Sequence, residues 1–441
     1  GGHVNGGRAG RIRVDLPHDF LPPEIGNLYV PHLLTVRPAS RAAPLDDPYD
    51  VVRTAVGQQL AGAALPPLSG KRVAVALGSR GLGRYSELLA GVLDALREAN
   101  AEPFLMPAMG SHGGGTPEGQ RLVLQEYGLL SHGVPLDTHD DTERVGTLRD
   151  GTAVHAATVA CNADAIVVVN RVKSHTGFRG PVESGLTKML VIGLGKRAGA
   201  ASMHAKGYRG FAARLQASRD LLLTHYPPVL GVAIVEDAEG QPTHVEALPG
   251  GDWAEREPML LEDAKRRMAR LPFDKLDVLV VERAGKDVSG LGMDPNVTGR
   301  FALGEPQAPN PTRIALLSLT PASEGNANGM GHADVVPRSF VDAIDPVATW
   351  TNVITSTSLG SARLPVVAPD ARTCIQIALA TCGVPVDAAR IAWIRSTADL
   401  TRFRVSEAAL AEANEPLEII SAAHAVEPPV GGQANEDATP R

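Results

Sequence analysis

One segment of the chain gathers more groups capable of chemistry than any other. Residues 170–204 read NRVKSHTGFRGPVESGLTKMLVIGLGKRAGAASMH and follow the apolar run 165–169, so their charged groups begin where a buried strand would end. Proteins of the α/β class place their ligand sites at such strand ends. Lys188 lies within the apolar sequence GLTKMLVIGLG, where an amine is costly to bury unless it is paired or used chemically. This favours a functional site over a solvated basic loop.

Two histidines belong to the same segment. His204 follows Lys188 by sixteen residues, which is too far for one helical face to present both, so the two can cooperate only if the fold brings them together. His175 stands on a loop with a nearby glycine, between the expected strand and Lys188. The segment therefore predicts a site built from an amine and two imidazoles.

Two other expected strands also end in candidate groups. Arg80, in LGSRG, ends the first, and its planar guanidinium could hold a carboxylate or a phosphate through two parallel hydrogen bonds. His112, in GSHGGGT, ends the second, ahead of a helix start whose amides favour an anion. The glycines after it are Gly113, Gly114 and Gly115. Since chance explains three such strand ends less easily than one, we expect a common site.

Together these motifs resemble the lactate racemase family, the nickel-pincer enzymes. In that family a lysine carries a pyridinium-derived mononucleotide through a thioamide bond, a histidine sixteen residues later completes the nickel coordination, and a catalytic histidine lies shortly before the lysine. Lys188, His204 and His175 stand in those places. The G-S-R and G-S-H sequences that end at Arg80 and His112 look like the family's carboxylate-binding and second histidine motifs. The similarity covers most of residues 70–210 in order.

The resemblance implies a racemase or epimerase of a lactate-like 2-hydroxy acid. The implied cofactor is nickel held in pyridinium-3-thioamide-5-thiocarboxylic acid mononucleotide, the nickel-pincer nucleotide, attached covalently to Lys188 and supplied by cofactor maturation enzymes. It also implies a role for each candidate residue. These roles are His204 as nickel ligand, His112 and His175 as catalytic bases, Arg80 and Lys286 as substrate-binding cations, and Gly113, Gly114 and Gly115 as cofactor contacts.

The implied chemistry suits these residue types. The Cα–H bond of a 2-hydroxy acid has very low acidity, so removing hydride while a histidine takes the hydroxyl proton avoids a carbanion and leaves a planar keto acid. Hydride can return to either face, and two histidines with pKa values near neutrality can exchange roles. Nickel bound by cofactor sulfurs and a ring carbon needs one imidazole, which is why no conventional metal cluster is expected in the sequence.

Two other classes of function stay open. One is a nickel-free two-base epimerase or dehydratase, in which Lys188 would form a Schiff base or transfer a proton. The other is a non-catalytic protein that binds an anionic nucleotide. The sequence GLGKRAG at 193–199 matches neither a phosphate-binding P-loop nor a complete dinucleotide fingerprint, and H-E-x-x-H and G-x-S-x-G do not occur.

The order of apolar runs predicts an α/β protein. Strands are expected at 71–77, 103–109, 165–169 and 229–235, and helices at 86–100 and after Thr116-Pro117-Glu118, an N-cap with proline at the first helical position. A polar stretch, 249–257, precedes a helix at 258–270, and strands at 276–282, 313–319 and 391–394 form a second α/β unit. We expect domains at 1–271 and 272–425, with the active site in the cleft between them, and a disordered tail at 426–441.

Composition limits the partners. With 44% hydrophobic and 21% charged residues, the 441-residue chain is typical of a soluble globular protein. A net charge of −7 and 4% aromatic residues disfavour nucleic-acid binding. We find no signal-peptide core or membrane-spanning run, so we expect a cytoplasmic protein without membrane contact. Cys161, Cys374 and Cys382 form no C-x-x-C pair, which disfavours structural zinc and indicates buried thiols.

Overall fold

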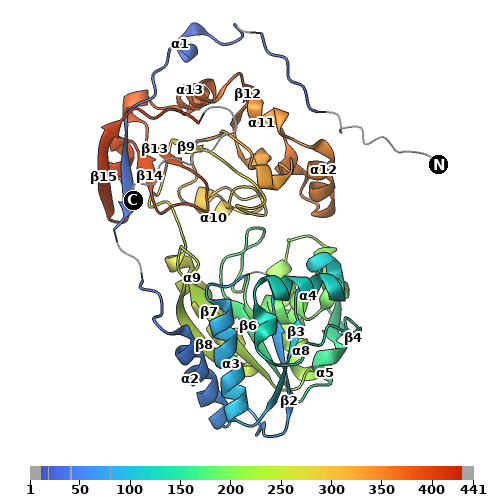
Figure 1. The fold of residues 1–441 in the computed structure, drawn as a ribbon. Coiled ribbons are helices and arrows are strands. Elements are labelled where there is room, and N and C mark those ends of the chain that lie inside the picture. Colours follow the sequence, from blue (N-terminus) through green and yellow to red (C-terminus); the bar gives the residue numbers. More distant parts are fainter. Residues whose placement is uncertain (1–10, 18, 40–41, 80, 430–441) are drawn as a thin grey trace, which may run out of the picture. The chain divides into compact units, whose positions relative to one another are not determined.

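The computed structural model describes residues 11–17, 19–39, 42–79 and 81–429, and these fall into two compact units (Figure 1). One is continuous in sequence, Arg41–Met268, and the other combines Gly1–Ser40 with Ala269–Arg441. We call them the continuous unit and the split unit. Each contains parallel strands connected by helices, so the expected α/β class is confirmed.

The continuous unit is built on a five-stranded sheet of order β3-β2-β6-β7-β8. Its first four strands run parallel, and the last is antiparallel to its neighbour. The chain goes from β2 outward to β3 and then returns past β2 to β6, so the strand order reverses between β2 and β6. Open α/β sheets bind ligands outside the carboxyl ends of the strands at such a reversal. The strands are β2 (Arg72–Leu77), β3 (Glu102–Pro107), β6 (Ala165–Arg171), β7 (Val229–Glu236) and β8 (Pro242–Pro249).

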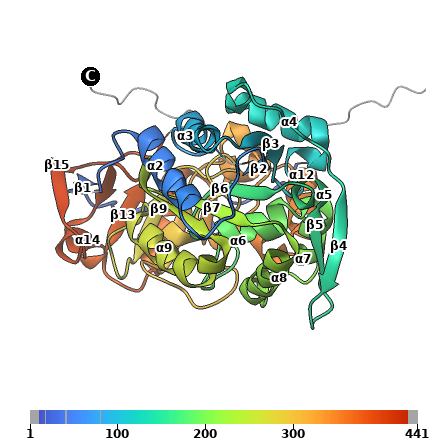
Figure 2. The same cartoon turned by 90° about the horizontal axis from the view of Figure 1, so that it is seen from below.

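Helices cover both faces of this sheet, as Figure 2 shows for α2 and α3 on one side and α8 and α9 on the other. Side chains alternate between the faces, with Val73 and Val75 in one core and Ala74 and Ala76 in the other. A small hairpin, β4 (Thr142–Thr147) and β5 (Ala153–Ala157), lies outside the sheet. The helices are α2 (Pro48–Ala61), α3 (Tyr85–Glu98), α4 (Pro117–Glu126), α5 (Thr158–Cys161), α6 (Leu186–Lys188), α7 (Lys196–His204), α8 (Phe211–His225) and α9 (Trp253–Arg267).

The split unit contains an eight-stranded sheet of order β12-β11-β10-β9-β13-β14-β1-β15. Five strands run parallel, and β14, β1 and β15 extend the sheet with antiparallel pairing. The strands are β1 (Leu33–Pro38), β9 (Val278–Val281), β10 (Arg313–Leu316), β11 (Val335–Pro337), β12 (Val366–Ala368), β13 (Ile391–Ile394), β14 (Phe403–Val405) and β15 (Leu417–His424). The helices are α1 (Pro23–Gly26), α10 (Pro295–Thr298), α11 (Arg338–Asp342), α12 (Pro346–Thr355), α13 (Ala371–Thr381) and α14 (Glu407–Ala411).

The predicted domain boundaries need correction at the amino-terminal end. The boundary expected after residue 271 lies close to the division after Met268, but β1 pairs with β14 and β15, so the start of the chain belongs to the split unit. A six-residue strand carries no local sign of partners so distant in sequence. Of the expected tail at 426–441, residues 430–441 lie outside the described residues.

The polar stretch 249–257 was wrongly separated from the helix that follows it. Helix α9 begins at Trp253, whose side chain is fully buried, and Glu257 is buried on its second turn. Burial of the Trp253 side chain stabilises this first turn despite its charged neighbours, so the helix starts five residues earlier than expected.

Among the described residues, none of the helices has both the length and the apolar character that a membrane span requires.

Candidate functional site

The loops after β2 and β3 meet through a hydrogen bond between side chains. Ser79 Oγ, just beyond β2, lies 2.5 Å from His112 Nδ1, beyond β3. Tyr127 Oη donates to the Ser79 carbonyl oxygen at 3.2 Å, which anchors the first loop from the end of α4. His112 therefore contacts the loop that follows β2, while Arg80 lies outside the described residues.

The loop that carries His112 is braced from within. Gln120, which is buried on α4, donates from Nε2 to the carbonyl oxygens of Gly110 and His112 at 3.2 and 3.1 Å. Thr116 caps α4 by accepting the Gly119 amide, as predicted. The three glycines after His112 have φ values of 63°, 70° and 64°. These values lie in the left-handed region, where a residue with a side chain would strain the backbone. The sequence Gly-Gly-Gly is thus required by the backbone as well as suited to a close ligand.

The loop after β6 holds His175 through both its backbone and its ring. The His175 amide donates to Glu183 Oε1 at 3.3 Å, and Arg179 donates to the same carboxylate oxygen at 2.8 Å. The Gly177 amide donates to His175 Nδ1 at 2.9 Å. Because Nδ1 accepts this bond, a neutral His175 ring carries its proton on Nε2.

Lys188 lies at a break in helical geometry. Helix α6 ends at Lys188, and a π-helical turn, Met189–Gly193, leads from it towards α7. Single π-turns are rare and often occur at functional sites. The start of this segment is tied to the end of β6, because Asn170 Nδ2 donates to the Gly185 carbonyl oxygen at 3.1 Å.

A buried carboxylate binds the residue that precedes Lys188. Glu257, on α9, accepts the Thr187 amide at 3.1 and 3.2 Å and the Thr187 hydroxyl at 2.5 Å. Burial raises the pKa of this carboxyl, against the lowering effect of the Thr187 bonds and the Arg219 charge. Glu257 therefore fixes the residue immediately before Lys188. This role was not predicted, because Glu257 stands in the stretch 249–257, which we interpreted only as polar.

The segment between Lys188 and His204 is docked against the end of β3. The Gly110 amide donates to the Gly193 carbonyl oxygen at 3.1 Å, and Lys196 Nζ donates to the Pro107 carbonyl oxygen at 2.6 Å. Lys196 is buried, and burial lowers its pKa to about 8, against the opposing charges of Asp140 and Asp137. These bonds join the His112 loop to the lysine segment.

His204, at the end of α7, completes the group. Its ring packs against Phe211 and Tyr208, at centroid distances of 5.2 and 5.9 Å. This desolvation lowers the pKa of His204, although the residue keeps an exposed edge, and the positive charges of Lys188, His112 and Arg214 lower it further. Lys188 and His112 are therefore within electrostatic reach of His204.

Tyr208 connects the two histidines that the sequence placed on opposite sides of Lys188. Its ring centroid lies 5.7 Å from that of His175 and 5.9 Å from that of His204. A Cβ on Gly177 would collide with the Tyr208 ring, so the His175 loop approaches this aromatic side chain closely. Tyr208 belongs to no motif singled out in the sequence, and its position depends on the fold.

The split unit holds the other substrate candidate, Lys286. Its Nζ donates to the Gly290 carbonyl oxygen at 2.7 Å and to Asn352 Oδ1 at 2.8 Å. Asn326 and Asn328 also donate to Asn352 Oδ1, at 3.1 and 3.2 Å. Asn352 Oδ1 thus accepts hydrogen bonds from three donors, two of which belong to the asparagine-rich loop at 324–334.

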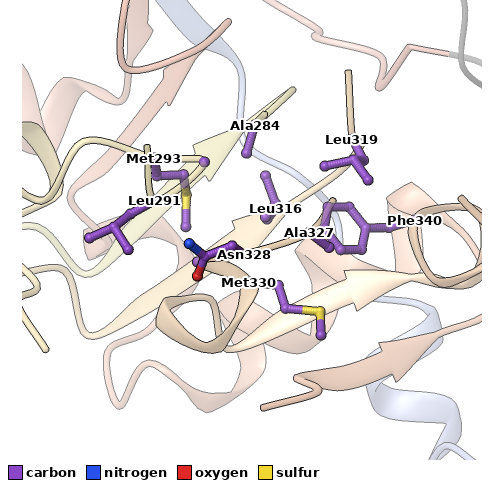
Figure 3. A pocket seen from close by; sticks show the side chains of 11 residues that line it. Ala284, Leu291, Met293, Leu316, Leu319, Ala327, Asn328, Met330 and Phe340 are labelled. Atoms are coloured by element: carbon purple, nitrogen blue, oxygen red, sulfur yellow. The ribbon is translucent and has the colours of Figure 1, made fainter. Parts of the chain in front are cut away.

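A small apolar pocket lies next to this polar group (Figure 3). Among its lining residues, Asn328 has the only polar side chain, and its Oδ1 is buried without a hydrogen-bond partner in the described part of the chain. Most of the walls belong to the core, including Leu316, Met330 and Phe340. We interpret the pocket as a gap in core packing.

No protein-family model matches the chain, and no curated protein matches its sequence. Among solved structures it is similar to a protein from Thermotoga maritima, with 13% identity over 64% of this chain and 74% of that one and a TM-score of 0.46. It is also similar to the lactate racemase apoprotein from Thermoanaerobacterium thermosaccharolyticum, with 14% identity over 78% of this chain and 85% of that one and a TM-score of 0.41. Both similarities are remote, so the case for a function rests on the residues of the site.

Proposed function

We propose that the protein is a racemase or epimerase of a 2-hydroxy acid that uses a nickel-pincer nucleotide tethered to Lys188. One observation supports this most strongly. His204 lies within electrostatic reach of Lys188 and His112, and it shares the Tyr208 ring with His175. These four residues belong to the two segments that follow β3 and β6, and they are the residues for which the sequence motifs imply roles.

The residues present fit the proposed cofactor. Lys188 offers a half-buried amine for attachment, and His204 offers an imidazole with an exposed edge for the metal. A nucleotide that brings its own sulfur and carbon donors needs one protein ligand, so a single imidazole is chemically sufficient. Of the left-handed glycines after His112, Gly114 borders open space, because a Cβ there would meet no atom within 4 Å, whereas Gly113 packs against α4 and Gly115 against Arg197.

Each candidate residue then has a defined role in the proposed reaction. When bound, the nucleotide would supply the electrophilic carbon that takes up and returns the substrate hydrogen as hydride. His112 and His175 exchange the hydroxyl proton of the two enantiomers, and Arg80 and Lys286 bind the carboxylate. His175 can donate from Nε2 in its neutral form, but it can take up a proton there only after releasing the Gly177 amide from Nδ1. A local rearrangement of the His175 loop is therefore part of the proposal.

Intact mass of protein co-expressed with cofactor maturation enzymes tests the proposal. We expect a covalent adduct and stoichiometric nickel on the unaltered chain, loss of the adduct in Lys188→Ala, and loss of nickel in His204→Ala. Lys206→Ala is the matched control, because Lys206 is an exposed lysine two residues after His204 and should leave the adduct in place.

Other outcomes favour the alternative functions. An adduct that persists in Lys188→Ala would move the attachment point. A chain that racemises without any adduct, and whose product carries solvent deuterium at Cα, would support the nickel-free two-base enzyme. A chain with neither adduct nor turnover after co-expression would support the non-catalytic nucleotide-binding protein.

A further inference from the structure

Three side chains with metal-ligating atoms meet beside the outer hairpin of the continuous unit, on elements that Figure 2 shows together at one end of the unit. Glu143 comes from β4, Cys161 is the last residue of α5, and His225 is the last residue of α8. One ligand atom from each lies within 4.8 Å of the other two. No residue of the proposed racemase site belongs to this group.

The backbone around these side chains is held by hydrogen bonds between the three elements. Glu143 pairs with Ala156 across the β4–β5 ladder. The Thr158 amide at the start of α5 donates to the Asp141 carbonyl oxygen at 3.0 Å. The Ala157 amide donates to the hydroxyl of Tyr226, the neighbour of His225, at 2.8 Å. The three ligands are therefore positioned by the fold before any metal binds.

The spacing of Glu143 and His225 suits two ligands of a tetrahedral metal ion. His225 Nε2 lies 3.3 Å from Glu143 Oε1. With metal–ligand bonds of about 2.0–2.3 Å, two ligands of a tetrahedral zinc ion lie about 3.3–3.8 Å apart. The side chains of Glu143 and His225 are 51% and 36% exposed, and Cys161 is half-buried, so an ion can enter from solvent and keep a water ligand.

We propose that Glu143, Cys161 and His225 form a zinc site with a water-accessible fourth position. Zinc favours this mixture of sulfur, nitrogen and oxygen ligands. Binding replaces the thiol proton with a zinc–sulfur bond and releases one proton to solvent, with no change of oxidation state. Without metal, burial raises the pKa of Cys161 to about 12, and the neighbouring Glu143 carboxylate contributes to the increase. The site therefore holds a protonated thiol until a metal displaces the proton.

Cobalt(II) is the probe, because it replaces zinc and its thiolate complexes absorb light through sulfur-to-metal charge transfer. The full-length chain is first stripped with chelator and then titrated with cobalt. Cys161 is the only cysteine of the continuous unit, and Cys374 and Cys382 are buried in the split unit. The absorption therefore reports on Cys161, and added zinc should abolish it by displacing cobalt.

Variants of the three proposed ligands test whether these side chains bind the metal. We expect Cys161→Ser to remove the band, and His225→Ala and Glu143→Gln each to weaken cobalt binding by about tenfold or more. His244→Ala is the matched control, because His244 Nε2 lies 3.2 Å from Glu246 Oε2 without a cysteine partner, and it should bind cobalt as the unaltered chain does. His204→Ala should also keep the band, which separates this site from the proposed nickel site.

Three results would overturn the proposed zinc site. Absence of a charge-transfer band in the unaltered chain would overturn it, as would an undiminished band in Cys161→Ser with native circular dichroism. A band that survives both His225→Ala and Glu143→Gln at full strength would show that cysteine alone binds the metal, and would also overturn it.

Discussion

The two units carry their candidate residues in different ways. In the continuous unit, His112 and His175 stand on short loops directly after parallel strands, and each loop is braced by a neighbouring side chain, Gln120 or Glu183. In the split unit, Lys286 lies in a network whose centre is Asn352, on α12 and 66 residues further along the chain. The first arrangement depends on strand order, whereas the second depends on a loop meeting a distant helix.

This difference suggests a division of labour. Short loops on a parallel sheet hold a proton-transfer group in place, as catalysis requires. A lysine on a loop supplies charge through a flexible stem, which suits the binding of a carboxylate. Variants in the continuous unit should therefore change turnover, and variants in the split unit should change substrate affinity.

The largest effect should come from the two histidines. His112→Ala and His175→Ala should each reduce turnover in both directions by about 10²–10⁴-fold, because every racemisation passes through both proton-transfer groups. Racemisation of each enantiomer by loaded enzyme measures this effect. His139→Ala, at an exposed histidine of the same unit, should be neutral. A loss confined to affinity would remove the histidines from the chemistry.

Removing the buried carboxylate should have the next largest effect. Glu257→Ala leaves the Thr187 amide and hydroxyl without their acceptor and opens a cavity, so we expect a loss of about 2–4 kcal/mol in the free energy of unfolding. Urea denaturation measures the loss, and amide exchange at Thr187 localises it. Glu262→Ala, at an exposed position on α9, is the control. Equal stability of the two variants would contradict the supporting role.

A smaller and different change is expected in the split unit. Lys286→Ala should raise KM by about 10–100-fold with little change in kcat, because a charged hydrogen bond to substrate contributes about 1.5–3 kcal/mol. Steady-state kinetics separate the two parameters. Lys275→Ala, whose amine bonds only the Asn310 carbonyl oxygen among the interactions identified, should leave KM unchanged. A fall in kcat alone would break the proposed division between the units.

The smallest effect depends on pH and concerns Lys196. Burial lowers its pKa from 10.5 to about 8, so between these values the unfolded chain binds more protons than the folded one. The free energy of unfolding should therefore rise as pH increases through this window, by at most about 3 kcal/mol, whereas at lower pH the amine is charged in both states and adds no pH dependence. Lys196→Met should lack the rise in urea denaturation at pH 7 to 10, while Lys206→Met, at an exposed lysine, should keep it. Parallel curves for both variants would refute the assignment.

Elements with strong local patterns could be predicted from the sequence. The apolar runs located β2, β3, β6 and β7 to within two residues, and Thr116-Pro117 marked the start of α4. Because parallel strands end at one edge, the runs also predicted that His112 and His175 follow strands of a single sheet, and the structure places them beyond β3 and β6, the two strands that flank β2.

The remaining parts depend on contacts between distant segments. Glu257 is 69 residues from Lys188 in sequence, and neither its burial nor its bond to Thr187 follows from the charged stretch in which it lies. Cys161 was expected to be a buried thiol, yet it is half-buried and meets Glu143 and His225 from two other elements. Such groupings require the tertiary fold, because no spacing rule connects their members.

The position of β1 has a consequence for the order in which the protein can fold. This strand lies between β14 and β15, and β15 joins the sheet only through it (Figure 1). At about 5–20 residues per second, a ribosome would need roughly 20–80 s to proceed from β1 to β15. During that time the continuous unit, complete at Met268, can fold, whereas the first strand of the other unit has no partner. We therefore expect a chaperone that binds extended apolar segments to meet β1 early in translation and to release it only near the end.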